Sequence, residues 1–164
     1  MIELLDKKHL RNDFDCGKEL LNNYLKNQAG QDIKRKLSAC FVLTKSAINI
    51  IQGYYTLSNN SIPLSSFPQH IQLKLPKSYT SIPTTLVGRL AVDKKYQGNG
   101  IGKILLIDAL KRSYESSLEI GSFAVVVDPI DEEAEKFYEK YDFIKLPESQ
   151  KMFIAIKTLK ELFS

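Results

Sequence analysis

Three glycines at positions 98, 100 and 102 lie between an apolar stretch and a long helical pattern. Glycine costs backbone entropy on folding, so three of them at one strand-to-helix junction indicate a ligand or a tight turn. Such a loop can direct backbone N–H groups toward an anion, and the N-terminus of the next helix adds partial positive charge. The cluster therefore predicts an α/β fold with a phosphate-binding loop, and a glycine-rich turn without a ligand is the alternative.

The spacing of these glycines excludes two common phosphate-binding motifs. A P-loop needs G-x-x-x-x-G-K-[ST], but Gln97 stands at its first glycine and Ile104 at its hydroxyl position. The dinucleotide-binding fingerprint needs G-x-G-x-x-G, whereas this chain has G-x-G-x-G and no evident acidic partner for a ribose.

Hydrophobic periodicity and turn residues predict a mixed α/β sheet, with strands and helices both alternating and adjacent along the chain. The predicted strands are Ile2–Leu5, Ser38–Thr44, Ile48–Ser58, Thr85–Val92, Phe123–Val127, about 143–146 and about 151–157. The predicted helices are Lys18–Ala29, which Gly30 should end or weaken, Ile101–Ser117 and Asp131–Tyr141. Four prolines between residues 59 and 85 predict a segment that is mostly loop.

Composition indicates a single domain, residues 1-164, in the cytoplasm. No apolar run is long enough to span a membrane, and two cysteines are too few for a disulfide framework. The two histidines lie far apart, so no metal site is expected. Residues 1–100 carry 14 Lys and Arg against 7 Asp and Glu, whereas residues 101–164 carry 9 against 12. This basic excess suits a polyanion or a phosphate-bearing cofactor, although solvated surface lysines are the simpler explanation.

The pattern Gln97-x-x-Gly100-x-Gly102 resembles the acetyl-CoA motif [RQ]-x-x-G-x-[GA] of the GCN5-related N-acetyltransferases, the GNAT superfamily. The resemblance implies the GNAT fold, an α/β fold whose mixed central sheet has about six to seven strands flanked by about four helices. It also implies acetyl-CoA as cofactor. The end of the preceding strand would contact pantetheine through Leu90, Ala91 and Val92. The pyrophosphate would be surrounded by Gln97, Gly98, Asn99, Gly100, Ile101, Gly102 and Lys103.

A second stretch, Ala134-x-x-Phe137-Tyr138-x-x-Tyr141-x-Phe143, resembles the family signature A-x-x-[FL]-Y-x-x-x-G-F. By this resemblance Tyr138 is the catalytic residue, a general acid that protonates the leaving thiolate; a packed aromatic side chain is the alternative. The chain departs from the signature at position 142, where Asp replaces Gly. We expect that change to affect the turn into the next strand more than the chemistry.

The N-terminal half resembles one subgroup, the acetyltransferase toxins of bacterial toxin–antitoxin systems. The similarity lies in Phe14-Asp15-Cys16-Gly17, Leu21-Asn22, Tyr24-Leu25, Ser38 and Gly53-Tyr54-Tyr55-Thr56-Leu57-Ser58. It implies acetylation of the α-amino group of aminoacyl-tRNA, which blocks translation, and a ribbon-helix-helix antitoxin as partner. Cys16 falls within this similarity, and we interpret it as a small buried residue and not a nucleophile.

Elementary acid–base chemistry also favours an α-amino acceptor. An α-amino group titrates near about pH 8 and a lysine near about 10.4, so the former is partly neutral without help. No Glu or His stands out as a general base. The residues expected to face tRNA are Lys34, Arg35, Lys36, Arg89, Lys94 and Lys95, of which Lys94 or Lys95 could serve the cofactor phosphates instead.

Two other functions stay open at this point. The chain could acetylate a small amine or a protein N-terminus without tRNA, or it could be a non-catalytic acyl-CoA-binding module. The presence of Tyr138 and of the glycine loop counts against the non-catalytic module. An exposed apolar C-terminal segment (Leu159, Leu162, Phe163) would support a homodimer.

Overall fold

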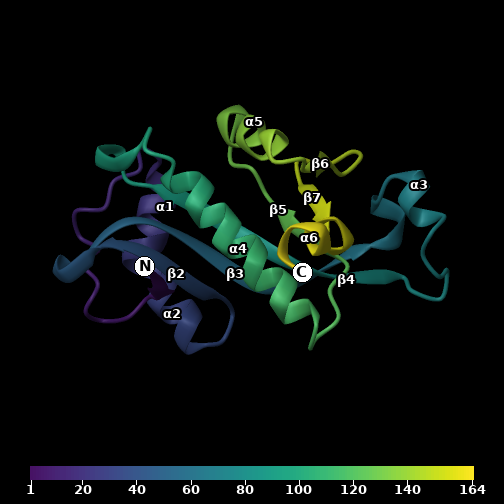
Figure 1. The fold of residues 1–164 in the computed structure, drawn as a ribbon, viewed down its shortest axis with the longest axis horizontal. Helices are drawn as coiled ribbons and strands as arrows, with labels where there is room; N and C mark the ends of the chain where they lie inside the picture. Colours follow the sequence, from purple (N-terminus) through teal and green to yellow (C-terminus); the bar gives the residue numbers. More distant parts are fainter. The chain divides into compact units, whose positions relative to one another are not determined.

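The computed structural model describes residues 1–45 and 47–164 and shows a mixed α/β fold (Figure 1). Its seven-stranded sheet has the order β1-β2-β3-β4-β5-β7-β6. The strands are β1 Ile2–Leu4, β2 Ala39–Lys45, β3 Ile50–Pro63, β4 Ser81–Val92, β5 Ala124–Val127, β6 Ile144–Lys145 and β7 Met152–Ala155. The α-helices are α1 Glu19–Asn23, α2 Ala29–Lys34, α3 Gln69–Gln72, α4 Ile101–Ser117, α5 Glu132–Lys140 and α6 Ile156–Phe163. The predicted fold class is confirmed.

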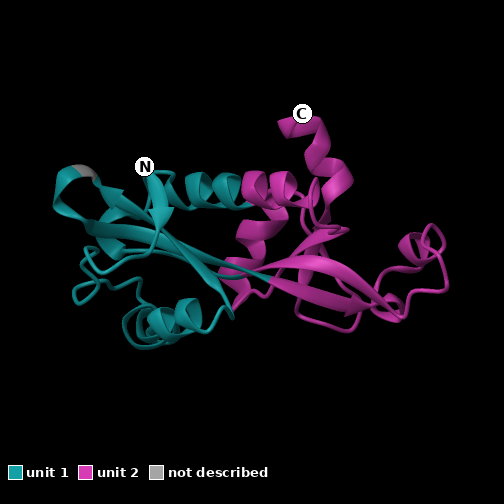
Figure 2. Cartoon of the chain, turned by 90° about the horizontal axis from the view of Figure 1, so that it is seen from below, with its two compact units in different colours: residues 1–58, 88–109 teal, residues 59–87, 110–164 magenta. Residues whose placement is uncertain are grey.

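The chain forms two compact units, coloured separately in Figure 2. Unit 1 comprises residues 1–58 and 88–109, and unit 2 comprises residues 59–87 and 110–164. Strands β3 and β4 and helix α4 each contribute residues to both units.

Unit 1 is built on an antiparallel arrangement of β1, β2 and the first part of β3. Ile2 pairs with Leu43, and the β2–β3 hairpin has an irregularity between Leu43 and Thr44. Alternate residues of these strands point into a core that the helices α1 and α2 also line. Within it, the rings of Phe14 and Tyr54 meet edge to face with centroids 5.6 Å apart. Burial of these large aromatic side chains stabilises this unit.

The helical segment from residue 19 to residue 34 is longer than predicted. Gly30 does not end it: a π-helical turn, Tyr24–Gln28, joins α1 to α2, which continues to Lys34. Leu25 and Ala29, on either side of the junction, are fully buried. One glycine inside a helix costs only about 1 kcal/mol relative to alanine, which the burial of these neighbours offsets.

Unit 2 is organised around β5, whose four residues are all buried, as the apolar run predicted. β5 pairs in parallel with β4, from Thr84↔Ala124 to Val87↔Val127, and antiparallel with β7. Phe67 packs edge to face against Phe123 and Phe153, with centroids 5.7 and 5.4 Å away. A strand covered on both faces carries few polar groups, which explains the unbroken apolar sequence.

The prediction that residues 59–85 are mostly loop was wrong at both ends. β3 continues to Pro63 and β4 begins at Ser81, and Leu64 N–H donates to the Thr80 carbonyl over 2.9 Å. Prolines lack only the N–H donor, and the Pro83 carbonyl still accepts a bond of 2.8 Å from Phe123 N–H. Pro63 and Pro83 therefore lie within strands, near their ends, whereas Pro68 and Pro76 lie outside them.

The C-terminal segment also differs from the prediction. The strands predicted at about 143–146 and about 151–157 are shorter in the structure, where they are β6 and β7. The residues that follow Ala155 form helix α6. Of the three residues predicted to form an exposed dimer face, Leu159 is fully buried and cannot belong to one. Phe163 packs on Tyr114 with ring centroids 6.2 Å apart, whereas Leu162 is 66% exposed. The three-residue spacing of Ile156, Leu159 and Leu162 is the helical signal that the sequence analysis missed.

We predict that Gly53→Ala destabilises the protein. A Cβ at this position would lie 2.8 Å from Leu105 Cδ1 and 2.9 Å from the Ala91 carbonyl oxygen, so backbone and core would have to shift. Overpacking of this kind costs about 1–3 kcal/mol, measurable by urea unfolding. Gly121→Ala is the matched control, because a Cβ there meets nothing within 4 Å. Equal stability of the two variants would contradict the close packing at Gly53.

Candidate functional site

The end of strand β4 leads directly into the glycine loop. β5 ends at Val127, opposite Val87, so β4 continues through Leu90, Ala91 and Val92 beyond that pairing. Ala91 is buried, whereas Leu90 and Val92 are half-buried. This stretch, whose residues were predicted to contact pantetheine, belongs to unit 1 together with the whole glycine loop.

A buried carboxylate holds the loop at its N-terminal side. Asp93 is 2% exposed and accepts two backbone hydrogen bonds, from Lys95 N–H to Oδ1 over 2.9 Å and from Asp15 N–H to Oδ2 over 3.0 Å. Lys94 N–H donates in turn to the Asp15 carbonyl over 2.8 Å. Asp93 thereby caps the 3₁₀ turn Lys94–Tyr96 and ties it to the N-terminal segment.

Gln97 secures the loop from within. Its Nε2 donates to the Val92 carbonyl over 2.9 Å and to the Cys16 carbonyl over 3.2 Å. The side chain predicted to surround the pyrophosphate thus fixes the shape of the loop. Asn99 acts similarly, donating from Nδ2 to the Tyr96 carbonyl over 3.2 Å.

The loop itself is exposed and has a conformation that requires glycine. Gly98 and Gly100 have φ values of 84° and 78°, in the left-handed region, while a Cβ at either position would meet nothing within 4 Å. Glycine is needed here for backbone conformation and not for space. Helix α4 begins at Ile101, so the first N–H groups of this 17-residue helix, including those of Gly102 and Lys103, have no acceptor within the helix. Such N–H groups form an anion-binding surface.

The predicted basic residues of unit 1 fall into two groups and one exception. Lys94, Lys95 and Lys103 are exposed on or beside the glycine loop, and Lys94 Nζ lies 3.6 Å from Asp15 Oδ2. The run Lys34–Lys36 is exposed at the end of α2. Arg89 is the exception: its Cζ lies 3.5 Å from the centroid of the Tyr24 ring, a cation–π contact in a half-buried position. Unit 1 carries thirteen Lys and Arg against eight Asp and Glu.

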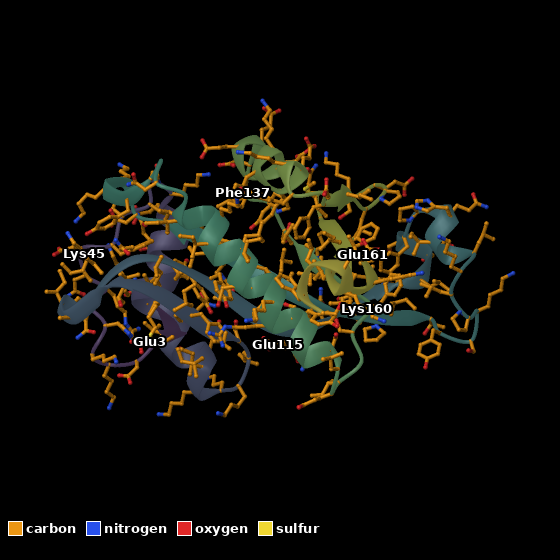
Figure 3. The ribbon with its side chains drawn as sticks, in the orientation of Figure 1. Glu3, Lys45, Glu115, Phe137, Lys160 and Glu161 are labelled. Carbon is orange, nitrogen blue, oxygen red and sulfur yellow. The ribbon has the colours of Figure 1, made fainter. Side chains whose placement is uncertain are left out.

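Tyr138, the predicted general acid, lies in unit 2 on helix α5, as does Phe137, labelled in Figure 3. Tyr138 is 6% exposed, and its ring packs between those of Phe137 and Phe143, each with a centroid 5.3 Å away. Within the described residues its hydroxyl has no hydrogen-bond partner. Burial raises the pKa of Tyr138 well above its ordinary value, so the hydroxyl keeps its proton at physiological pH.

The departure from the family signature falls in the turn after α5, as expected. Asp142 has φ 70°, the left-handed conformation in which glycine is favoured and Asp is tolerated. The turn is closed by Phe143 N–H, which donates to the Tyr138 carbonyl over 3.2 Å. Asp131 caps the other end of α5 through a 2.9 Å bond from Ala134 N–H to Oδ1.

The two cysteines are buried, in agreement with the interpretation of Cys16. Burial raises the pKa of both thiols, that of Cys40 to about 12, which disfavours the nucleophilic thiolate. Cys16 N–H donates to Asn22 Oδ1 over 2.8 Å, a bond that shapes the loop before α1. His9 is likewise buried: its Nδ1 accepts from Asp6 N–H over 2.9 Å, and its Nε2 lies 2.8 Å from Glu3 Oε1.

Two kinds of feature are absent from the residues that the structure describes. No group of three or more His, Cys, Asp or Glu side chains is arranged to hold a metal ion. None of the helices formed by the described residues is both long enough and apolar enough to cross a membrane.

The geometry agrees with comparisons to known proteins. The family described as "Acetyltransferase (GNAT) domain" matches residues 79–158. A protein of Mycobacterium tuberculosis (strain ATCC 25618 / H37Rv) named tRNA-acetylating toxin is 33% identical over 130 residues, covering 79% of this chain and 75% of that protein. The structure of AtaT complexed with acetyl-methionyl-tRNAfMet matches with a TM-score of 0.91 and 30% identity, over 100% of this chain and 99% of AtaT.

A second AtaT structure, of a point variant bound to the C-terminus of the antitoxin AtaR and to acetyl-CoA, matches with a TM-score of 0.85. Its identity is 27%, over 100% of this chain and 98% of that one. A strand, a glycine loop and a helix in this order, with a tyrosine-bearing helix after them, define an acetyltransferase of the GNAT class. The chain belongs to the GNAT acetyltransferase family.

Proposed function

We propose that this protein transfers an acetyl group from acetyl-CoA to the α-amino group of aminoacyl-tRNA and so acts as a toxin that blocks translation. The observation that carries the proposal is the fixed, exposed glycine loop between β4 and the N-terminus of α4. The similarity to a tRNA-acetylating toxin and to AtaT with its acetylated tRNA supports the choice of substrate.

The residues present fit acetyl-CoA. Left-handed backbone at Gly98 and Gly100 and open space beside both leave the loop N–H groups accessible to a pyrophosphate. Exposed Lys94, Lys95 and Lys103 add positive charge around it. The free length of β4 at residues 90–92 offers backbone groups to a pantetheine amide. A bound acetyl-CoA supplies a thioester that is activated toward amines.

Tyr138 performs the proton transfer in this proposal. The amine nitrogen forms a bond to the acetyl carbon, the carbon–sulfur bond breaks, and Tyr138 gives its proton to the departing sulfur. A tyrosine hydroxyl carries its proton at physiological pH, and burial, which raises the pKa of Tyr138, leaves it protonated. The amine must be neutral to attack, and an α-amino group that titrates near about pH 8 is partly neutral without a base. The proton that its nitrogen loses when the amide forms passes through water and restores the Tyr138 hydroxyl.

The proposal includes the protein's surroundings. We infer a single GNAT domain that acts in the cytoplasm, where charged tRNA is found, and that is neutralised by a ribbon-helix-helix antitoxin. The complex of AtaT with the C-terminus of AtaR supports an antitoxin partner. A homodimer remains part of the proposal, but it cannot use Leu159, which is buried within unit 2.

Acetyl transfer from radiolabelled acetyl-CoA tests the reaction directly. We expect label on bulk aminoacylated tRNA and none on deacylated tRNA. Tyr138→Phe should lose at least about tenfold in rate, within the range of general-acid contributions, and should keep its affinity for acetyl-CoA. Its fold should persist, because the hydroxyl has no hydrogen-bond partner among the residues that the structure describes.

Tyr141→Phe is the matched control for that variant. Tyr141 follows α5 and packs on Phe137 with centroids 5.2 Å apart, so removing its hydroxyl should leave the rate unchanged. Equal rates for Tyr138→Phe and wild type would remove the general-acid role. Transfer to free amines or peptides but not to charged tRNA would replace the proposed substrate.

Charge reversal at the end of α2 tests the contact with tRNA. Lys34/Arg35/Lys36→Glu exchanges three exposed cations for anions, so tRNA affinity should fall at least about tenfold at moderate salt and the salt dependence should become shallower. Filter binding with deacylated tRNA measures both effects. Lys157/Lys160→Glu, on exposed positions of α6, is the control; unchanged tRNA binding by the triple variant would exclude this run.

A further inference from the structure

Unit 1 contains an open pocket of about 590 Å³ along the helical segment 19–34, and none of the residues assigned to catalysis or to the cofactor lines it. Its volume lies within the usual range of ligand sites, about 300–1,000 Å³. The pocket is centred on the π-helical turn Tyr24–Gln28, which supplies Tyr24, Asn27 and Gln28 to its wall. π-Helical turns are rare in proteins, and those that occur are often found at functional sites.

One side of the pocket is held by a short hydrogen-bonded chain. Tyr24 donates its hydroxyl proton to Asp32 Oδ2 over 2.8 Å, and Gln28 Nε2 lies 3.5 Å from the same oxygen. The Tyr24 ring is covered by the Arg89 guanidinium on one face. Burial and the neighbouring Asp32 raise the pKa of Tyr24 to about 12, so the hydroxyl stays a hydrogen-bond donor to the Asp32 carboxylate.

The other side presents uncommitted carboxamides. Asn23, Asn27 and Gln31 follow at four-residue intervals, line the pocket and are exposed. Helical residues four apart lie on the same face, so the three amides form a row. Each carries a donor and an acceptor in one plane, which is the pattern that matches the edge of a nucleobase.

The rim of the pocket has the remaining features of a nucleotide site. Leu20 and Leu37 line it and are 73% and 62% exposed, so they offer apolar surface to the faces of a base. Arg35 also lines it, and a guanidinium is well suited to a phosphate. Unpaired RNA is recognised by this combination of base-edge hydrogen bonds, contacts to base faces and phosphate contacts.

We propose that this pocket binds an unpaired nucleotide at the 3′ end of tRNA, with the amide row reading the base and Arg35 holding its phosphate. The inference rests on the proposed function and deepens it: Asn23, Asn27 and Gln31 become determinants of which acceptor ends are used. The basic run Lys34–Lys36 then lies beside the bound base, because Arg35 lines the same pocket.

Asn27→Ala/Gln31→Ala tests the amide row. Alanine is the strongest helix former, so the segment stays helical in the variant. Two probes are compared by fluorescence anisotropy at one salt concentration: a deacylated tRNA with its complete 3′ end, and the same tRNA without its four unpaired 3′ nucleotides. Wild type should bind the complete tRNA about tenfold more tightly, and the variant should bind both equally, since it lacks the amides that would hydrogen-bond the base.

The control is Asn12→Ala/Gln69→Ala, which removes two exposed amides outside the pocket and should behave as wild type. Acetyl-CoA affinity should be equal in all three proteins. A pocket variant that still prefers the complete tRNA would overturn the pocket assignment, while acetyl transfer by wild type would leave the proposed function standing. Absence of both tRNA binding and acetyl transfer in wild type would overturn the two proposals together.

Discussion

The Asp93 carboxylate is the interaction on which the position of the glycine loop depends. It accepts from Lys95 at the start of the loop and from Asp15, 78 residues earlier in the chain. Asp93 is 2% exposed, and a buried polar group left without hydrogen-bond partners costs about 1–3 kcal/mol or more, so these bonds favour one position for the loop. Gln97 adds a second tie to the same N-terminal segment through the Cys16 carbonyl. These hydrogen bonds therefore hold the loop in place although it contains three glycines.

Electrostatics divide the chemistry between the two parts of the chain. Unit 1 has the basic excess, the helix N-terminus and the exposed loop, all of which favour anions. Unit 2 supplies a tyrosine whose burial raises the pKa and keeps the proton on the hydroxyl. In the proposed reaction, the features of unit 1 would bind the cofactor phosphates and Tyr138 would protonate the departing thiolate.

Local patterns were the part of the structure that could be predicted. Helix α4 has the predicted bounds, β5 is the predicted buried strand, and Asp142 falls in the predicted turn. The role of Asp93 could not be predicted from the sequence, because its partner Asp15 lies close to it only in the folded chain. The π-helical turn and its pocket were missed for a related reason: the apolar spacing of Leu21, Tyr24 and Leu25 is the same in an α-helix. The roles assigned to the loop residues and to Tyr138 stay predictions.

The most direct test of this account is the affinity of Gly100→Ala for acetyl-CoA, measured by calorimetry. The added methyl group faces open space, so only the left-handed backbone at φ 78° is disturbed. If the loop binds the pyrophosphate through its fixed backbone, affinity should fall at least about fivefold, the equivalent of about 1 kcal/mol of strain, with the stability of the core unchanged. Gly121→Ala should bind as wild type. Unchanged affinity in Gly100→Ala would contradict the assignment of this loop as the cofactor site.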